Sequence, residues 1–216
     1  MRQSVTPREV AAAEWRLPEH LHGDLVTGRV RQPQTDAPAV FYTDGSVSRR
    51  QIGGRLGWIT GWGYIAVDGR YGCGKYPQFT GKTGNDVVVT TELRGVWHAV
   101  GEVLADGPVT VIIDSTHAAD VLRKWQAGDT TMPGGYTGSR RRVPTLELLR
   151  QAIAAHPGHL TVQHVKGHAG NVLNEAADTL AQLGMRWARD NLTSDDVVHR
   201  AEGVAGGFLD DYRRHR

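Results

Sequence analysis

Four acidic side chains stand at positions where a fold can use them for chemistry. Asp44 and Asp114 each end an apolar, strand-like run, Glu92 opens a predicted helix, and Asp178 lies within a later one. Because functional sites in open α/β sheets form at the carboxyl ends of strands, Asp44 and Asp114 are predicted to lie side by side. Clustered carboxylates repel and raise one another's pKa unless a cation compensates. The four acids therefore predict a pocket that binds divalent cations.

The ligand chemistry favours hard cations. Carboxylate oxygens select Mg²⁺ or Mn²⁺, and zinc is disfavoured because one cysteine and scattered histidines show no zinc-ligand spacing. Two such ions can activate a water molecule and stabilise the leaving oxygen in phosphodiester cleavage. Each acid also has an ordinary explanation: Glu92 suits the positive end of its predicted helix, and Asp178 lies off the apolar stripe of its helix, where acids are usually solvated. Their occurrence together predicts metal-dependent chemistry on a phosphate.

A histidine lies in a glycine-flanked loop shortly before the last acid. His168 stands between Gly167 and Gly170, and imidazole titrates near neutral pH. A loop of this kind can carry a proton-transfer group; the alternative is a surface histidine without a role. The nearby acids favour proton transfer.

The spacing of apolar residues predicts elements in the order β-β-β-α-β-α-α-β-α. Strands are predicted at 40–43, 62–67, 70–76, 109–113 and 160–165, with 45–61 as a loop and Asp68-Gly69 as a hairpin turn. Helices are predicted near 90–104, 116–126, 145–156, 173–187 and 197–208. An antiparallel start followed by alternation predicts an α/β fold with a five-stranded mixed sheet, three antiparallel strands then two parallel, flanked by helices.

The chain has 216 residues, enough for one domain with extensions. We predict an N-terminal extension and linker over 1–37 with a short helix at 6–15, a catalytic domain over 38–192, and a helical C-terminal appendage over 193–216. A net charge of +2 and a pI of about 8.8 are weak indications of a nucleic-acid partner. The single Cys73 excludes an intrachain disulfide and suits a reducing compartment, and no uncharged run approaches the roughly 20 residues that cross a membrane. We expect a cytoplasmic monomer that makes no membrane contact.

Taken together, the motifs make the chain similar to the type 1 ribonucleases H. The resemblance covers roughly 38–190 and is carried by Tyr42-Thr43-Asp44-Gly45-Ser46, Glu92-Leu93, Asp114-Ser115, Val165-Lys166-Gly167-His168-Ala169-Gly170, Asn174-Glu175 and Asp178. It implies the ribonuclease H fold and hydrolysis of the RNA strand of RNA–DNA hybrids, leaving 5′-phosphate and 3′-hydroxyl ends. It also implies two Mg²⁺ ions per site, with Mn²⁺ as a substitute.

The resemblance assigns roles to single positions. It implies that Asp44 bridges both metals, that Glu92 and Asp114 share one of them, and that Asp178 holds the other. His168 would assist proton transfer or product release, and Glu175 would support its loop.

The resemblance also implies a set of substrate contacts, namely Gly45, Ser46, Thr90, Thr91, Trp125, Arg140, Arg141 and Arg142. Trp125 matches a tryptophan that starts the family's substrate-binding handle, and the three arginines would meet backbone phosphates unless they form only a solvated loop. The chain departs from the family just before Glu92, where Val87-Val88-Val89-Thr90-Thr91 replaces an Asn-rich stretch that contacts RNA 2′-hydroxyls. Thr90, Thr91 and backbone groups are the predicted substitutes.

Two other functions compete with hybrid cleavage. One is a DNA-cutting nuclease of the same superfold, similar to resolvases or integrases, which is disfavoured because such enzymes lack the Lys166–Gly170 loop. The other is a non-catalytic nucleic-acid-binding module, which would be favoured by loss of a carboxylate, whereas all four are present.

Overall fold

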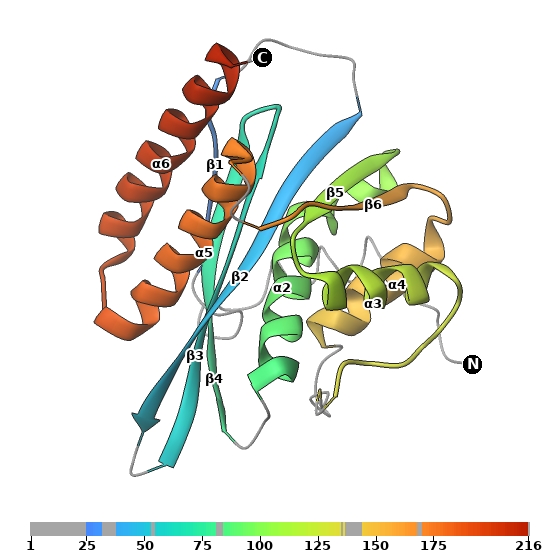
Figure 1. Cartoon of the computed structure of the whole chain (residues 1–216), viewed down its shortest axis with the longest axis horizontal. Coiled ribbons are helices and arrows are strands. Elements are labelled where there is room, and N and C mark those ends of the chain that lie inside the picture. The colour runs from blue at the N-terminus through green and yellow to red at the C-terminus, as the bar shows by residue number, and fades with distance from the viewer. Residues whose placement is uncertain are drawn as a thin grey trace, which may run out of the picture.

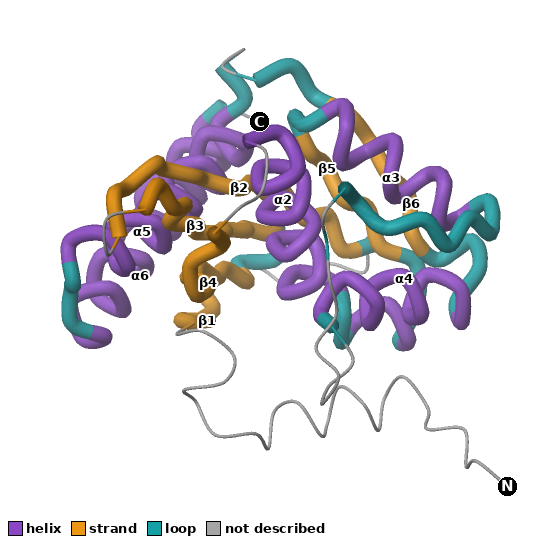
Figure 2. The backbone as a smooth tube through the Cα atoms, turned by 90° about the horizontal axis from the view of Figure 1, so that it is seen from below, coloured by secondary structure: helices purple, strands orange, loops and turns teal. Residues whose placement is uncertain are grey.

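The computed structural model describes residues 25–31, 38–52, 55–80, 84–134, 136, 144–167 and 170–215. These residues form three layers, with a twisted sheet between two groups of helices (Figures 1 and 2). The strands are β1 (Leu25–Arg29), β2 (Ala39–Ile52), β3 (Arg55–Ala66), β4 (Arg70–Thr80), β5 (Val109–Ile113) and β6 (Leu160–His164). The helices are α2 (Gly84–Val100), the short 3₁₀ helix η2 (Val103–Ala105), α3 (Thr116–Gln126), α4 (Thr145–Ala155), α5 (Val172–Asp190) and α6 (Ser194–Arg214).

The sheet has the strand order β1-β4-β3-β2-β5-β6. β1, β4, β3 and β2 pair antiparallel, whereas β2, β5 and β6 pair parallel. The α/β class, the mixed sheet and the flanking helices are therefore confirmed, but six strands replace the five predicted. The added strand is β1, which pairs with β4 inside the segment predicted to be an extension. The predicted helix at 6–15 lies outside the described residues, and the domain boundaries stay a prediction.

The segment 45–61 was expected to be a loop, and this expectation is wrong. Its residues extend β2 and β3 into one long hairpin whose register runs unbroken from Phe41↔Ala66 to Ile52↔Arg55. The segment's glycines and arginines are poor strand signals. The strands form because the ladder satisfies their backbone groups and because two of the glycines permit close helix packing. The turn at Asp68-Gly69 is confirmed, with Gly69 at φ 93°.

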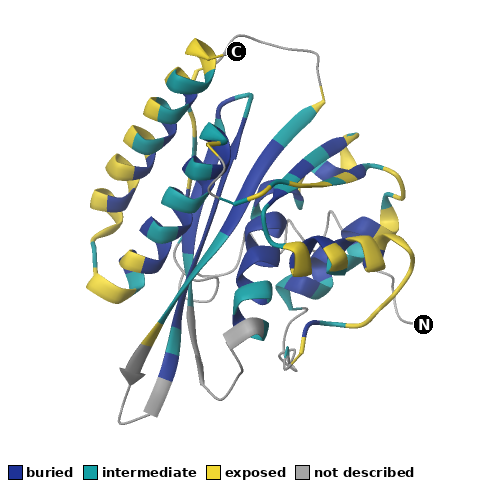
Figure 3. Ribbon diagram, in the orientation of Figure 1, coloured by how far each residue is buried: buried dark blue, intermediate teal, exposed yellow. Residues whose placement is uncertain are grey.

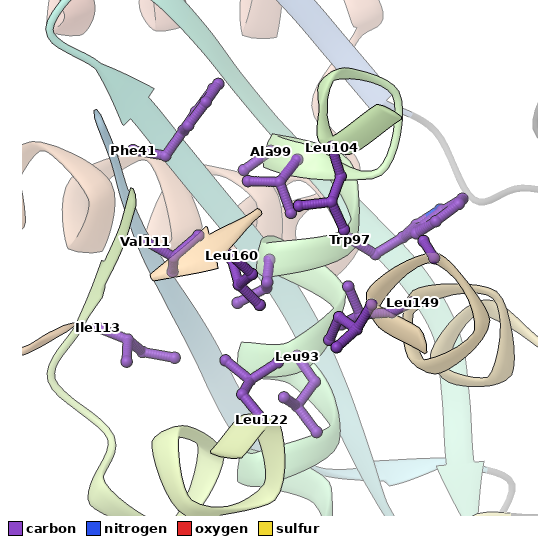
Figure 4. Close-up of a cluster of buried hydrophobic side chains, with 14 of the residues drawn as sticks. Phe41, Leu93, Trp97, Ala99, Leu104, Val111, Ile113, Leu122, Leu149 and Leu160 are labelled. Atoms are coloured by element: carbon purple, nitrogen blue, oxygen red, sulfur yellow. The ribbon is translucent and has the colours of Figure 1, made fainter. Parts of the chain in front are cut away.

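Two apolar cores lie on opposite faces of the sheet. The larger one packs α2, α3 and α4 against β2, β3 and β5 through buried residues such as Phe41, Leu93 and Val111 (Figure 4). The second packs α5 and α6 against the other face, where Tyr42 and Ile65 meet Leu180. The outer side of α6 is exposed and its inner side buried (Figure 3). The helix predicted over 197–208 is confirmed within α6. No helix in the described ranges has the length and apolar character needed to cross a membrane.

Glycines set the separation between α5 and the sheet. A methyl group at Gly61 would overlap backbone atoms of Gly184 and Met185, and one at Gly63 would overlap those of Ala177 and Ala181. Interiors this dense do not absorb an added carbon without a backbone shift. The two glycines of β3 therefore allow α5 to lie unusually close to the strand beside Asp44.

The glycines of α6, in contrast, are not crowded by neighbouring atoms. A Cβ atom at Gly203 would meet nothing within 4 Å, and its φ is not in the left-handed region. Because glycine costs a helix about 0.5–1 kcal/mol relative to alanine, Gly203→Ala should raise the free energy of unfolding by that amount. For a chain of this size Tm should rise by roughly 1–4 °C.

Thermal melts of Gly203→Ala and wild type would test this expectation. Gly69→Ala is the matched control, because its positive φ makes alanine strained there and Tm should fall. A lower Tm for Gly203→Ala would contradict the open environment of that position.

Candidate active site

Two neighbouring parallel strands bring Asp44 and Asp114 together. β2 pairs with β5 in a register that sets Thr43 opposite Ile113, so the next residue on each strand is an acid. The predicted juxtaposition is confirmed, although β2 does not end at Asp44 but continues to Ile52. Asp114 directly follows the last residue of β5, and Ser115 after it caps α3 by accepting a hydrogen bond from Ala118 N at 3.3 Å.

Glu92 joins these acids from α2. The expectation that Glu92 opens its helix is wrong, because α2 begins at Gly84 and Glu92 lies in its middle. The macrodipole therefore does not explain this acid. The β-branched stretch before Glu92 has low helix propensity. It is helical because tertiary packing buries Val87. The buried Thr91 hydroxyl is satisfied within the helix, where it donates to Val87 O at 2.7 Å. Gly45 lets the strand approach, since a Cβ atom there would lie 2.6 Å from Glu92 N.

The three acids form a compact oxygen cluster. One carboxylate oxygen from each of Asp44, Glu92 and Asp114 lies within 4.8 Å of the others. Asp44 is 7% exposed and Glu92 4%, and Glu92 Oε2 is buried without a hydrogen-bond partner in the described part of the chain. An unpartnered buried carboxylate oxygen facing two other carboxylates needs a cation or a proton. The cluster therefore fits a hard divalent ion.

The electrostatics of the cluster point the same way. Burial, followed by repulsion from Asp114 and Asp178, raises the pKa of Asp44 to about 8, while the Gly45 amide, 2.7 Å from Asp44 Oδ1, opposes the shift. Burial and the charge of Asp44 raise the pKa of Glu92 well above its ordinary value. The raised pKa values of Asp44 and Glu92 favour their protonated forms in the absence of a metal, and a bound cation would displace these protons.

Asp178 lies at the edge of the cluster. It is not among the three acids whose oxygens converge, but its charge raises the pKa of both Asp44 and Glu92. It lies half-buried on α5, where Gln182 Nε2 is 3.0 Å from each of its carboxylate oxygens. The amide of Gln182 thus orients this carboxylate from the next turn of the helix.

Asn174 is a site residue to which the sequence patterns gave no role. Its side chain is 3% exposed, and its Nδ2 donates to Asp114 Oδ2 at 3.3 Å. Gly167 adjoins the same oxygen, since a Cβ atom there would lie 2.8 Å from Asp114 Oδ2. The signal that could have revealed Asn174 is spacing, because 174, 178 and 182 follow one another at helical steps of four. We interpret Asn174 as a residue that positions Asp114.

The raised pKa of Asp44 predicts how stability varies with pH in the absence of divalent ions. Because the pKa rises from 3.8 to about 8 on folding, its stabilising contribution is complete below about pH 4 and is lost as pH rises through about 8. In EDTA, Tm should therefore be roughly 6–12 °C lower at pH 8.5 than at pH 5.5, which corresponds to about 3 kcal/mol.

Thermal melts in EDTA across this range would measure the effect. Asp44→Asn is the matched variant, because its amide does not titrate and the slope with pH should flatten. Mg²⁺ should restore Tm of the wild type most strongly at the alkaline end. Parallel slopes for wild type and Asp44→Asn would show that another group is responsible.

Several predicted substrate contacts are buried in the structure. Thr90 and Thr91 are 2% and 0% exposed within α2, and Trp125 is 2% exposed with its indole N–H donating to Thr131 O at 2.9 Å. These three side chains do not reach the surface of this structure, and their roles as substrate contacts stay predictions. Trp125 fixes the segment after α3 to the core. Gly45 and Ser46 are partly exposed beside Asp44.

The remaining predicted residues have different positions. Glu175 lies half-buried in the first turn of α5, whose N-cap is Asn171. His168 and the run Arg140-Arg141-Arg142 lie outside the described residues. Their roles stay predictions.

Comparisons with known proteins agree on one family. The family model described as RNase H matches residues 36–186. The chain is 32% identical over 152 residues to the Ribonuclease H of Ruegeria sp. (strain TM1040), covering 68% of this chain and 92% of that protein. It is 31% identical over 152 residues to the Ribonuclease H of Saccharopolyspora erythraea, covering 69% and 91%. Among solved structures it is similar to LC11-RNase H1 in complex with RNA/DNA hybrid, at 17% identity and a TM-score of 0.43, covering 70% of this chain and 99% of that one. The chain belongs to the ribonuclease H family.

Proposed function

We propose that this chain hydrolyses the RNA strand of RNA–DNA hybrids by a two-metal-ion mechanism, leaving 5′-phosphate and 3′-hydroxyl ends. The observation that carries the proposal is the convergence of Asp44, Glu92 and Asp114 within 4.8 Å, in a chain whose residues 36–186 match the RNase H family model. That membership and the chemistry of the donors support the proposed substrate class and mechanism.

The carboxylates divide between two ions in this proposal. Glu92 and Asp114 would hold one ion, Asp178 would hold the other, and Asp44 would contribute ligand oxygens to both. Mg²⁺ is the proposed ion and Mn²⁺ its substitute, since all the donors are oxygens. When bound, the ions supply an activated water and stabilise the leaving oxygen.

The protein's own contribution is to hold these donors in place. Asp44 and Asp114 are fixed by the β2–β5 ladder, and Asn174 and Gln182 hold the carboxylates of Asp114 and Asp178 by hydrogen bonds. Donors that are oriented before binding need no rearrangement during the reaction. His168 would assist proton transfer or product release, and Glu175 would support its loop.

The same proposal assigns the surroundings of the site. Gly45 and Ser46 contact the substrate beside Asp44, and Arg140, Arg141 and Arg142 contact its phosphates. We infer that the enzyme acts as a monomer in the cytoplasm, where the buried Cys73 remains a thiol.

A labelled RNA–DNA hybrid tested beside double-stranded RNA, double-stranded DNA and single-stranded RNA would decide the substrate class. We expect cleavage of the hybrid alone, in Mg²⁺ or Mn²⁺ and not in EDTA. Cleavage of double-stranded DNA would favour a resolvase-like activity instead. Binding of the hybrid without cleavage in any metal would favour a non-catalytic module.

A further inference from the structure

The strand that carries Asp44 continues well beyond the acid cluster. After Asp44, β2 continues to Ile52 and stays paired with β3 over this whole length. Asp44 lies opposite Gly63, and Arg49 lies opposite Trp58. Figure 1 shows this end of the hairpin projecting past α2 and α5. We call residues 46–52 and 55–61 the hairpin arm. Because the arm is a direct extension of the catalytic strand, its position relative to Asp44 is fixed.

The arm carries charge of one sign. Between Asp44 and Asp68 the sequence contains no acidic residue, but it contains Arg49, Arg50 and Arg55. Such a basic segment beside a cluster of acids is not needed to neutralise those acids under the proposed function, because bound cations would do so. Its charge instead complements a polyanion that lies across the site.

Arg49 is held in a geometry suited to phosphate. Its side chain is exposed, and its guanidinium carbon lies 4.7 Å from the centroid of the Trp58 ring. The two residues are directly opposite in the ladder, so strand pairing maintains the stack. A guanidinium stacked on an aromatic ring keeps its N–H groups in its own plane, where they can donate to a phosphate.

The spacing matches a duplex substrate. Alternation along a strand puts Arg49 on the same face as Gly45, which is the face that α2 covers. The five residues from Asp44 to Arg49 span roughly 17 Å at about 3.3 Å each. Measured along the axis of a double helix, where each base pair occupies about 3.4 Å, this length corresponds to roughly five base pairs.

We propose that the hairpin arm is a second substrate-binding surface, on which Arg49, stacked on Trp58, contacts a backbone phosphate about five base pairs from the cut. This inference rests on the proposed function, because it assumes that a nucleic-acid duplex lies across the acid cluster. The arm binds without reading sequence, since its contact is with the backbone.

Duplexes of unequal arms provide the test. In each substrate, a short run of ribonucleotides within a DNA strand fixes the position of the cut. The first duplex is long on both sides of the cut, the second is long only on the 5′ side, and the third is long only on the 3′ side. Arg49→Ala should raise KM about tenfold at low salt on the long duplex and on one of the two asymmetric duplexes. On the other, KM and kcat should equal those of wild type. The slope of log KM against log salt should fall by about one for the affected substrates.

Arg200→Ala, an exposed position on α6, is the matched control and should leave all three substrates unchanged. Equal effects of Arg49→Ala on all three duplexes, or no effect on any, would overturn the hairpin arm as a binding surface. If wild type cleaves none of the three, the proposed function itself is wrong. The two failures are therefore distinguishable.

Discussion

Asp114→Asn should reduce the rate of hybrid cleavage about a thousandfold or more while the protein stays folded. Asp114 contributes an oxygen to the three-acid cluster, and its loss weakens the charge stabilisation that bound cations provide, which is worth several kcal/mol in such sites. Folding should persist, because asparagine has nearly the same shape and its amide oxygen can accept the hydrogen bond that Asn174 donates to Asp114.

The measurement is single-turnover cleavage of a labelled hybrid, combined with Tm in Mg²⁺ and in EDTA. Mg²⁺ should raise Tm of the wild type more than that of Asp114→Asn, because binding to the native state stabilises it. Asp120→Asn removes an exposed acid on α3 and should change neither activity nor the Mg²⁺ effect. Wild-type cleavage by Asp114→Asn would show that the site is assigned wrongly.

Gly61→Ala should lower the free energy of unfolding by about 3 kcal/mol or more, which corresponds to a decrease in Tm of roughly 6–12 °C. The added methyl group would overlap the backbone of α5 at Gly184 and Met185. A backbone segment cannot rotate away as a flexible side chain can, so α5 must move from the sheet. Because α5 carries Asp178, cleavage should fall together with stability.

Thermal melts and cleavage rates at a temperature well below Tm would separate the two effects. Gly203→Ala makes the same substitution in a helix where the methyl group meets no atom, and it should leave activity unchanged. An unchanged Tm for Gly61→Ala would show that α5 can move away from β3 without loss of stability, which would contradict this prediction.

Local patterns sufficed for some elements and failed for others. The continuous apolar run 109–113 became β5, and the segment 116–126 became α3, because in each case the local sequence and its packing agree. The hairpin 45–61 could not be predicted, because its strands depend on pairing and on close contact with α5 rather than on side-chain pattern. The start of α2 was missed for the same kind of reason: buried Val87 holds β-branched residues in a helix.

The acids of the candidate site were accessible to sequence reasoning because strand ends and helix faces constrain where charged groups can lie. Asp44 and Asp114 follow adjacent positions of a parallel ladder, which a pattern of apolar runs can foresee. The burial of Thr90, Thr91 and Trp125 could not be predicted from the sequence. A threonine or tryptophan beside a motif is equally consistent with a substrate contact and with a core position. Only packing distinguishes the two.

Two elements that contribute to the core, β1 and α6, lie outside the segment that matches the family model. The family model matches 36–186, yet Val26 of β1 and Val197, Ala201, Ala205 and Leu209 of α6 are buried in the core that α5 shares. The segment that matches the family model therefore lacks two elements that cover this core. A polypeptide restricted to residues 36–186 would present an uncovered apolar surface to water and would be expected to self-associate.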